Sequence, residues 1–363
     1  MPIYTTPVFN INLKKITENY NLVKSLYPNT TLSAVIKDNA YGLGATEVAT
    51  ALYQNTDCRN FFVAHASEGA IIRPHVANAN IYVLQGIGKD SLKYFQDYNL
   101  IPAISTPQML QFWHQNKIES IKPIIHIETG LNRLGFTASD LANLTPDELN
   151  EFSYVLSHLA CADECNHPLN KEQLTKFTNL KKQYFPNTPC TLSASGGTFL
   201  GAEYHFDMLR LGAVLYGINS APYHKTQPQN VIEVKAPVLQ IKNIKKKESV
   251  GYSASYVAPK DMSICIISIG YGDGIPRSLS NCGKVVFYKD NIPYFCPILG
   301  RISMDNIICD VSQIPSLSIA DFGYIYCNDQ TINNVAVQAN TIAYELISNL
   351  GKNPRFIKEY IKD

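Results

Sequence analysis

The stretch that decides the fold is Ser33-Ala34-Val35-Ile36-Lys37-Asp38-Asn39-Ala40-Tyr41-Gly42-Leu43-Gly44. It opens with apolar residues, two of them β-branched, and passes through a lysine into small, turn-prone residues. This order predicts a buried strand whose carboxyl end presents the amine of Lys37, followed by a turn into a helix. Burial lowers the pKa of a lysine and frees its neutral amine for Schiff-base chemistry. The alternative is a surface lysine just beyond a core strand, and this stretch alone leaves both interpretations open.

Length and composition are those of an ordinary folded protein. The 363 residues are enough for two domains, or for one large barrel with an appendage. Charged residues make up 17% of the chain, hydrophobic residues 45%, and the formal net charge is +1. With no block of basic or acidic residues, neither nucleic acid nor a membrane surface is an expected partner. The amino terminus lacks the features of a secretory signal, and no apolar run approaches the roughly 20 residues of a membrane span.

The nine cysteines are scattered without a C-x-x-C pair. This usage indicates a reduced, cytoplasmic protein rather than a disulfide framework. One local cluster combines His158, Cys161, Cys165 and His167. Because its spacing matches no common zinc finger, we predict no metal site there.

A regular alternation of short apolar runs and segments of helical length fills the first 230 residues or so. Eight such units match a (β/α)8 barrel of the TIM type, in which chemistry lies at the carboxyl ends of the strands. Lys37, His126, His158, Ser195 and Arg210 all occupy such ends, which favours the reactive amine over the surface lysine. The predicted strands are residues 33–36, 61–64, 81–84, 101–104, 123–127, 154–158, 191–195 and 208–211.

The pattern of apolar and polar residues changes at about Asn230. Strand-like runs at 238–241, 263–269, 284–288 and 306–311 replace the alternation, with Gly, Pro, Asn and Asp between them. We therefore predict an α/β fold with two domains. Residues 1–229 form the barrel, and residues 230–363 form a mainly-β domain.

Seven motifs in a fixed order resemble those of bacterial alanine racemases, which are pyridoxal-phosphate enzymes of fold type III. The resemblance covers nearly the whole chain, and the order of the motifs is more specific than any one of them. The motifs are residues 34–44, 129–136, 158–164, 210–217, 251–256, 270–274 and 300–305.

The resemblance implies an isomerase that interconverts L-alanine and D-alanine and so supplies D-alanine for peptidoglycan. Lys37 would hold pyridoxal 5'-phosphate through its amine and, once displaced by the substrate, act as the base on one face of Cα. Tyr252 would act on the opposite face, since one base does not easily reach both. A phenol with an ordinary pKa near 10 is a poor base at neutral pH, so positive charge is expected beside it.

The same resemblance assigns the other cofactor contacts. Arg210 would face the pyridine nitrogen and, because a guanidinium keeps its proton, leave that nitrogen unprotonated. The ring would then be a weaker electron sink, with fewer side reactions. His158 would pack or hydrogen-bond against the ring, and Tyr216 is assigned to the core. Ser195 and the amides of Gly212 and Ala213 lie where the loops after strands 7 and 8 of such a barrel commonly bind a phosphate. To these phosphate contacts the resemblance adds the side chains of Tyr41 and Tyr344.

For the substrate, the resemblance implies that Arg133 and the backbone at Met304 bind the carboxylate. Tyr271 and Tyr256 would narrow the access to the site. In the family, Tyr252, Tyr271 and Met304 come from the second subunit, so a homodimer with shared active sites is expected.

The sequence departs from the family pattern beside the arginine. Where many members carry a carbamylated lysine that positions this arginine, the chain has His126. An imidazole does not supply the same negative charge, so Arg133 must be held differently, and a bound anion such as chloride or the nearby Glu128 are the two candidates. Asp38 and Leu43 also replace the family's usual alanine and histidine.

Three other functions share parts of the pattern: a broad-specificity racemase of small amino acids, a fold-type-III decarboxylase and a non-catalytic pyridoxal-phosphate-binding protein. The decarboxylase typically carries a cysteine–aspartate pair where this chain has Ser303-Met304-Asp305, and the binding protein would end near residue 230. A dinucleotide-dependent dehydrogenase is disfavoured, because no G-x-G-x-x-G opens a helix after a strand.

Overall fold

The computed structural model describes residues 4–362 and divides them into two compact units. The barrel unit comprises residues 16–40 and 44–229. The C-terminal unit comprises residues 230–362 together with two earlier segments, 4–15 and 41–43. Within residues 4–362, no helix has the length and apolarity to cross a membrane.

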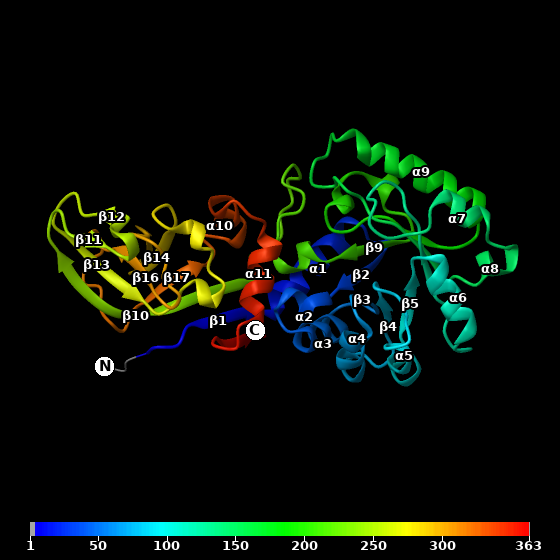
Figure 1. The fold of residues 1–363 in the computed structure, drawn as a ribbon, viewed down its shortest axis with the longest axis horizontal. Coiled ribbons are helices and arrows are strands. Elements are labelled where there is room, and N and C mark those ends of the chain that lie inside the picture. The colour runs from blue at the N-terminus through cyan, green and yellow to red at the C-terminus, as the bar shows by residue number, and fades with distance from the viewer. Residues whose placement is uncertain (1–3, 363) are drawn as a thin grey trace. The chain divides into compact units, whose positions relative to one another are not determined.

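Eight parallel strands form the barrel unit (Figure 1), and each overlaps one of the eight predicted strands, although β8 ends at Thr191 where the prediction extended to Ser195. Their neighbours run in the order β8-β7-β6-β5-β4-β3-β2-β9. A bridge between Ala194 and Arg210 brings β8 and β9 together, and the amide of Arg210 donates to the Ser193 carbonyl at 3.0 Å. This closes the TIM-like barrel. The strands are β2 (Thr31–Val35), β3 (Asn60–Val63), β4 (Asn80–Val83), β5 (Ile101–Ile104), β6 (Ile124–His126), β7 (Tyr154–Leu156), β8 (Cys190–Thr191) and β9 (Met208–Leu211).

The barrel strands are buried almost throughout, as expected for parallel strands covered by helices. Some of the helices of this unit begin at residues that are typical of helix starts. Thr106 caps α6 and is followed by Pro107, and Thr145 and Glu148 form a capping box on α8. The helices are α1 (Leu13–Leu26), α3 (Ala45–Asn55), α4 (Ala66–Ile72), α5 (Leu92–Tyr98), α6 (Pro107–Gln115), α7 (Ala138–Ala142), α8 (Pro146–Asn150) and α9 (Pro168–Tyr184).

The C-terminal unit is built on a mixed sheet in the order β15-β14-β17-β10-β1-β18, with β13 pairing β10 and β16. Its first strand comes from the start of the chain: β1 (Val8–Asn12) pairs antiparallel with β10 and parallel with β18. The other strands are β10 (Ile232–Ile244), β11 (Ser249–Val250), β12 (Tyr256–Val257), β13 (Met262–Ile267), β14 (Lys284–Lys289), β15 (Ile292–Pro297), β16 (Ile307–Asp310), β17 (Phe322–Tyr326) and β18 (Ile357–Ile361), and the helices are α10 (Ile332–Ala339) and α11 (Ala343–Lys352).

Candidate functional site

The segment after Lys37 has an unusual backbone. Four consecutive residues, Asp38, Asn39, Ala40 and Tyr41, have φ between 53° and 56°. This left-handed turn forms the element α2 (Lys37–Tyr41), directly after β2. Left-handed backbone costs about 1–2 kcal/mol for each residue with a Cβ, so the surrounding contacts must hold it. Strain of this kind collects at functional sites.

Glu68 and Asn39 are among the residues that hold this turn. The Glu68 carboxylate, at the start of α4, accepts the amide of Asp38 at 2.6 Å. Its other oxygen accepts the amides of Ala64 and His65 at 2.7 and 3.0 Å. Asn39 Oδ1 accepts the amide of Ala45 at 2.8 Å, at the first residue of α3. The lysine's backbone is therefore tied to the ends of two neighbouring helices.

The Lys37 amine lies among charged groups of both signs in the barrel unit. Burial lowers the pKa of Lys37, and the charge of Arg133 lowers it further, whereas Glu68 and Asp38 act in the opposite direction. Burial together with Arg210 lowers the pKa of His158 well below its ordinary value. A lowered lysine pKa favours the neutral, nucleophilic amine.

His126 shares this environment. It is 7% exposed, and burial together with Arg210 and Arg133 lowers its pKa to about 4. The imidazole is therefore neutral at pH 7 and adds no positive charge to the site.

Arg210 is fixed by four acceptors at the carboxyl ends of neighbouring strands. Its Nη1 donates to Thr191 Oγ1 at 2.6 Å, and its Nη2 donates to the carbonyls of Ser157 and Leu192 at 2.6 and 3.0 Å. His158 Nδ1 lies 3.3 Å from Nη2. Burial lowers the pKa of Arg210 to about 9, which still leaves it charged at neutral pH. A guanidinium carries five N–H donors, and no described residue accepts a hydrogen bond from Nε.

Glu128 acts on the backbone of the loop that carries Arg133. Its carboxylate accepts the amide of Gly130, and hydrogen bonds from the amides of Asn132, Gly130 and Arg133 lower its pKa against the opposing effect of burial. The described residues offer the Arg133 guanidinium no ion pair within 4 Å. Of the two candidates for holding Arg133, Glu128 is therefore in place, and it holds the loop rather than the guanidinium.

Ser195 and Gly212, two of the residues predicted to contact the phosphate, lie together in the barrel unit. Ser195 is 3% exposed, and its Oγ accepts the amides of Gly212 at 2.9 Å and Val214 at 3.3 Å. Tyr216 is buried, and its hydroxyl donates to the Val35 carbonyl at 2.9 Å, so its assignment to the core is confirmed.

The two tyrosines predicted to bind phosphate lie together in the C-terminal unit. The rings of Tyr41 and Tyr344 are 6.0 Å apart between centroids. Close backbone packing holds the Tyr41 segment on α11, because a Cβ on Gly351 would lie 2.1 Å from the Cα of Gly42. Lys358 Nζ donates to the carbonyls of both glycines, at 3.3 Å to Gly42 and 2.7 Å to Gly351.

Three of the remaining predicted residues lie on the surface of the C-terminal unit. Tyr252 is 64% exposed, Met304 54% and Tyr271 40%. The loops of Tyr271 and Met304 are joined, since the Tyr271 amide donates to the Ser303 carbonyl at 3.0 Å and the Gly272 amide donates to the Met304 carbonyl at 2.9 Å.

Tyr256 has different surroundings. Its ring packs against a buried apolar cluster that includes Val250 and Met262, and its hydroxyl lies 3.9 Å from Met262 Sδ. Among the described residues, no hydrogen bond joins Tyr256 to Tyr271 or Met304.

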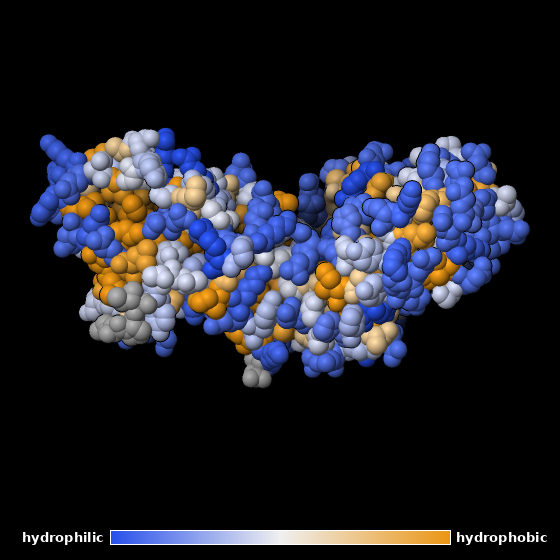
Figure 2. Space-filling model, turned by 60° about the horizontal axis from the view of Figure 1, so that its bottom comes forward, coloured by the Kyte–Doolittle hydropathy of each residue, from blue (hydrophilic) through white to orange (hydrophobic). Residues whose placement is uncertain are grey.

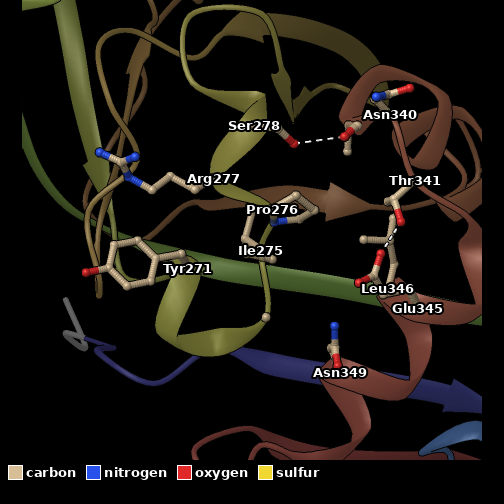
Figure 3. Close-up of a pocket in the computed structure, with 12 residues that line it drawn as sticks. Tyr271, Ile275, Pro276, Arg277, Ser278, Asn340, Thr341, Glu345, Leu346 and Asn349 are labelled. Carbon is tan, nitrogen blue, oxygen red and sulfur yellow. Dashed lines mark hydrogen bonds between the residues drawn. The ribbon is translucent and has the colours of Figure 1, made fainter.

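A hollow of about 450 Å³ lies beside Tyr271 in the C-terminal unit (Figure 3). Arg277 lies near Tyr271 at one end, and Thr341 and Glu345 are hydrogen-bonded to each other at the other end. Ser278 Oγ donates to the Ala339 carbonyl at 2.9 Å and so ties this wall to the end of α10. Within residues 4–362, no three His, Cys, Asp or Glu side chains are arranged to hold a metal ion.

Sequence reasoning missed Glu68 and the left-handed turn. A glutamate at the third position of α4 is a capping-box feature, which the structure bears out with the amide of His65. Nothing in the sequence indicates that the same carboxylate also accepts the amide of Asp38. Asparagine and aspartate tolerate left-handed backbone, but Ala40 and Tyr41 do not favour it, so the turn is not readable from residue type.

A TIM-like barrel whose first strand delivers a lysine among arginines, followed by a mainly-β unit, defines a class of two-domain barrel enzymes. The family models described as "Alanine racemase, N-terminal domain" and "Alanine racemase, C-terminal domain" match residues 11–220 and 231–358. The chain therefore belongs to the alanine racemase family.

Individual relatives match over the full length. The alanine racemase of Rickettsia rickettsii is 36% identical over 361 residues, which cover 97% of this chain and 98% of the relative. The crystal structure of alanine racemase from Bartonella henselae, with covalently bound pyridoxal phosphate, has a TM-score of 0.90 at 34% identity and covers 99% of this chain and 100% of its own. The biosynthetic alanine racemase of Pseudomonas aeruginosa has a TM-score of 0.89 at 28% identity, covering 98% and 99%.

Proposed function

We propose that this protein is a pyridoxal-phosphate-dependent alanine racemase that interconverts L-alanine and D-alanine. The observation that carries the proposal is the position of Lys37 at the end of β2, among Arg133, Arg210 and His158 and with a lowered pKa. Full-length family membership supports alanine as the substrate. Supply of D-alanine for peptidoglycan follows as the expected biological role.

The residues present fit the cofactor. Lys37 would hold the cofactor through its side-chain amine, whose pKa is lowered by burial so that the neutral, nucleophilic form is favoured. Arg210 offers an Nε–H that no described residue uses, and because a guanidinium keeps its proton, Arg210 would hydrogen-bond the pyridine nitrogen without protonating it. The phosphate would be held by Ser195, Gly212, Ala213, Tyr41 and Tyr344. When bound, pyridoxal phosphate supplies the electron sink that stabilises the charge left when Cα loses its proton.

Racemisation requires that a proton leave one face of Cα and that another arrive on the opposite face. The amine of Lys37 would take or return the proton on one face. Tyr252 does the same on the other face through its phenolic oxygen. A positioned acid–base residue of this kind contributes typically about 10²–10⁴-fold to a rate.

The substrate carboxylate would bind to Arg133 and to the backbone at Met304. A bidentate contact from a guanidinium fixes both the distance and the plane of a carboxylate. Glu128 supports this role by holding the backbone on either side of Asn132, which has a positive φ of 54°.

We infer further that the active protein is a homodimer in which Tyr252, Tyr271 and Met304 of each chain complete the site of the other. Their exposure supports this inference, because large apolar and aromatic side chains are rarely gathered on a free surface without a partner. Apolar surface is extensive on the C-terminal unit (Figure 2). Among the described residues, the barrel unit exposes only three large hydrophobic side chains, Leu26, Ile71 and Tyr94.

The test starts from the full chain loaded with pyridoxal phosphate. Incubation with either enantiomer of alanine, followed by chiral chromatography, is expected to give the same mixture of both. In deuterium oxide, each enantiomer is expected to gain deuterium at Cα. A loaded protein that leaves both enantiomers unchanged would rule the proposal out. For the dimer, the activity per chain is expected to fall with dilution in step with the dimer fraction measured by sedimentation.

A further inference from the structure

The segment between α11 and β18 contacts the two loops that carry Tyr271 and Met304, and the proposed function gives this contact no role. Arg355 Nη2 lies 2.6 Å from Asp273 Oδ1, in the Tyr271 loop, and Arg355 Nη1 lies 2.7 Å from Asp305 Oδ1, in the Met304 loop. One guanidinium therefore bridges both loops. A lysine could not bridge both carboxylates with the same geometry, because its single side-chain nitrogen lacks the planar, forked donors of a guanidinium.

Other hydrogen bonds hold the buried Asp273 carboxylate in position to accept this arginine. The residue is 3% exposed, and its Oδ2 accepts the amide of Gly270 at 2.9 Å. Its Oδ1 also accepts Asn353 Nδ2 at 3.0 Å, and Asn353 Oδ1 in turn accepts the Arg355 amide at 2.8 Å. The carboxylate is thus satisfied by three donor groups, two of them from the segment that follows α11.

The two loops meet with no space between them. A Cβ on Gly270 would lie 2.3 Å from the Ser303 carbonyl oxygen and 2.4 Å from that of Met304. The Gly272 amide already donates to the Met304 carbonyl. A shift of one loop therefore moves the other, and the bridging guanidinium of Arg355 limits the shift of both.

We propose that Arg355 is a positioning residue for the substrate, which sets the place of the Met304 backbone and the Tyr271 ring by holding Asp273 and Asp305 together. This inference rests on the proposed function, because it assumes that Met304 and Tyr271 meet the substrate. Arg355 itself has no proposed contact with the reacting atoms or the cofactor. Its effect is therefore expected on substrate binding more than on the chemical step.

The experiment compares Arg355→Gln and Arg355→Lys with the unaltered chain, each loaded with pyridoxal phosphate. We expect both variants to raise KM for alanine about tenfold or more while kcat falls less than about threefold, since a loosened loop mainly weakens binding. The matched control is Lys245→Gln, which removes another exposed ion pair of the same unit, 2.9 Å from Asp261. The control is expected to leave both constants unchanged.

Amide hydrogen exchange supplies a readout that does not depend on activity. In Arg355→Gln, peptides covering residues 270–274 and 300–306 are expected to exchange at least about tenfold faster, because their shared hydrogen bonds open more often. Lys245→Gln is expected to leave these peptides unchanged. If Arg355→Gln does not fold, Arg355→Lys gives the same comparison with the charge retained.

The outcomes separate this inference from the proposed function. Unchanged KM and unchanged exchange in both variants would overturn the role of Arg355. A fall in kcat at constant KM would also overturn it, because it would point to the chemical step. If the unaltered loaded chain does not racemise alanine, the proposed function fails and the substrate role of Arg355 fails with it, whereas faster exchange would still establish that Arg355 holds the two loops.

Discussion

The two halves of the predicted active site differ in how completely the folded chain prepares them. In the barrel unit, Arg210 is 4% exposed, Ser195 3% and His126 7%, and hydrogen bonds fix both Arg210 and Ser195. In the C-terminal unit, Tyr252 and Met304 are more than half exposed. The barrel unit therefore fixes its own share of the predicted cofactor-binding groups, Arg210 and Ser195 among them, within one chain. The groups of the C-terminal unit are displayed on a surface, as expected for residues that complete a partner's site.

The two units also differ in their content of histidine. All eight histidines of the chain lie between residues 65 and 224, inside the barrel unit. The C-terminal unit has none in its sequence. Any loss of stability caused by histidine protonation must therefore begin in the barrel unit.

Removal of the lysine should disable the half of the site that lies in the barrel unit. Lys37→Ala is expected to lower racemase activity by about 10⁴-fold or more, because the same amine holds the cofactor and moves a proton. The visible absorption of lysine-bound pyridoxal phosphate should be lost with it. The matched control is Lys93→Ala, which changes an exposed lysine of the same unit. Retained activity in Lys37→Ala would rule out Lys37 as the residue that holds the cofactor and moves the proton.

Replacement of the exposed phenol is expected to act on one face only. Tyr252→Phe should lower racemisation by about 10²–10⁴-fold while one enantiomer of alanine still exchanges its Cα hydrogen for deuterium. Exchange followed separately from L- and D-alanine by mass spectrometry measures this asymmetry. Tyr294→Phe, on β15, is the control. Equal loss of exchange from both enantiomers would mean that Tyr252 is not the base of a single face.

The barrel was predictable because its strands are short apolar runs that repeat at regular intervals. Each of the eight runs needs only local burial to be recognised, and the predicted strand 101–104 agrees to the residue with β5. Lys37 and Arg210 could be placed at strand ends for the same reason. The roles assigned to them rest on the resemblance and not on the periodicity.

What the sequence could not provide is pairing over long distances. The segment Val8-Phe9-Asn10-Ile11 alternates like a half-buried strand, but its partners include Lys235 and Ile357, more than 200 residues away. The bridge from Arg355 to Asp273 and Asp305 likewise depends on loops that meet only in the fold. Local pattern does not encode such contacts, because they follow from the tertiary arrangement.

A third test uses acid. The pKa of His126 is about 4 in the folded chain and about 6.5 when unfolded, so its neutral form stabilises the fold fully above pH 6.5, and this stability is lost as the pH falls toward 4. Between pH 7 and pH 5, the free energy of unfolding should fall by about 2 kcal/mol through this residue. His126→Asn should be less sensitive over the same range.

The chain offers a local probe for this measurement. Its single tryptophan, Trp113, is fully buried in the barrel unit, so tryptophan fluorescence during urea unfolding follows that unit. His75→Asn changes an exposed histidine and is the control. The same pH dependence in His126→Asn and in the unaltered chain would show that His126 is not the source of the acid sensitivity.

A substitution of Glu128 tests how the loop that carries Arg133 is held, and a modest change is expected. Glu128→Gln keeps an acceptor oxygen for the loop amides but removes the charge, so KM for alanine should rise about fivefold, roughly 1 kcal/mol, with kcat nearly constant. Because Glu128 binds the loop backbone directly, activity should not depend on chloride in either protein. Glu119→Gln, an exposed carboxylate of the same unit, is the control. Activity that requires chloride in the unaltered chain would instead assign the support of Arg133 to a bound anion, and the barrel unit would then not be complete without an added ligand.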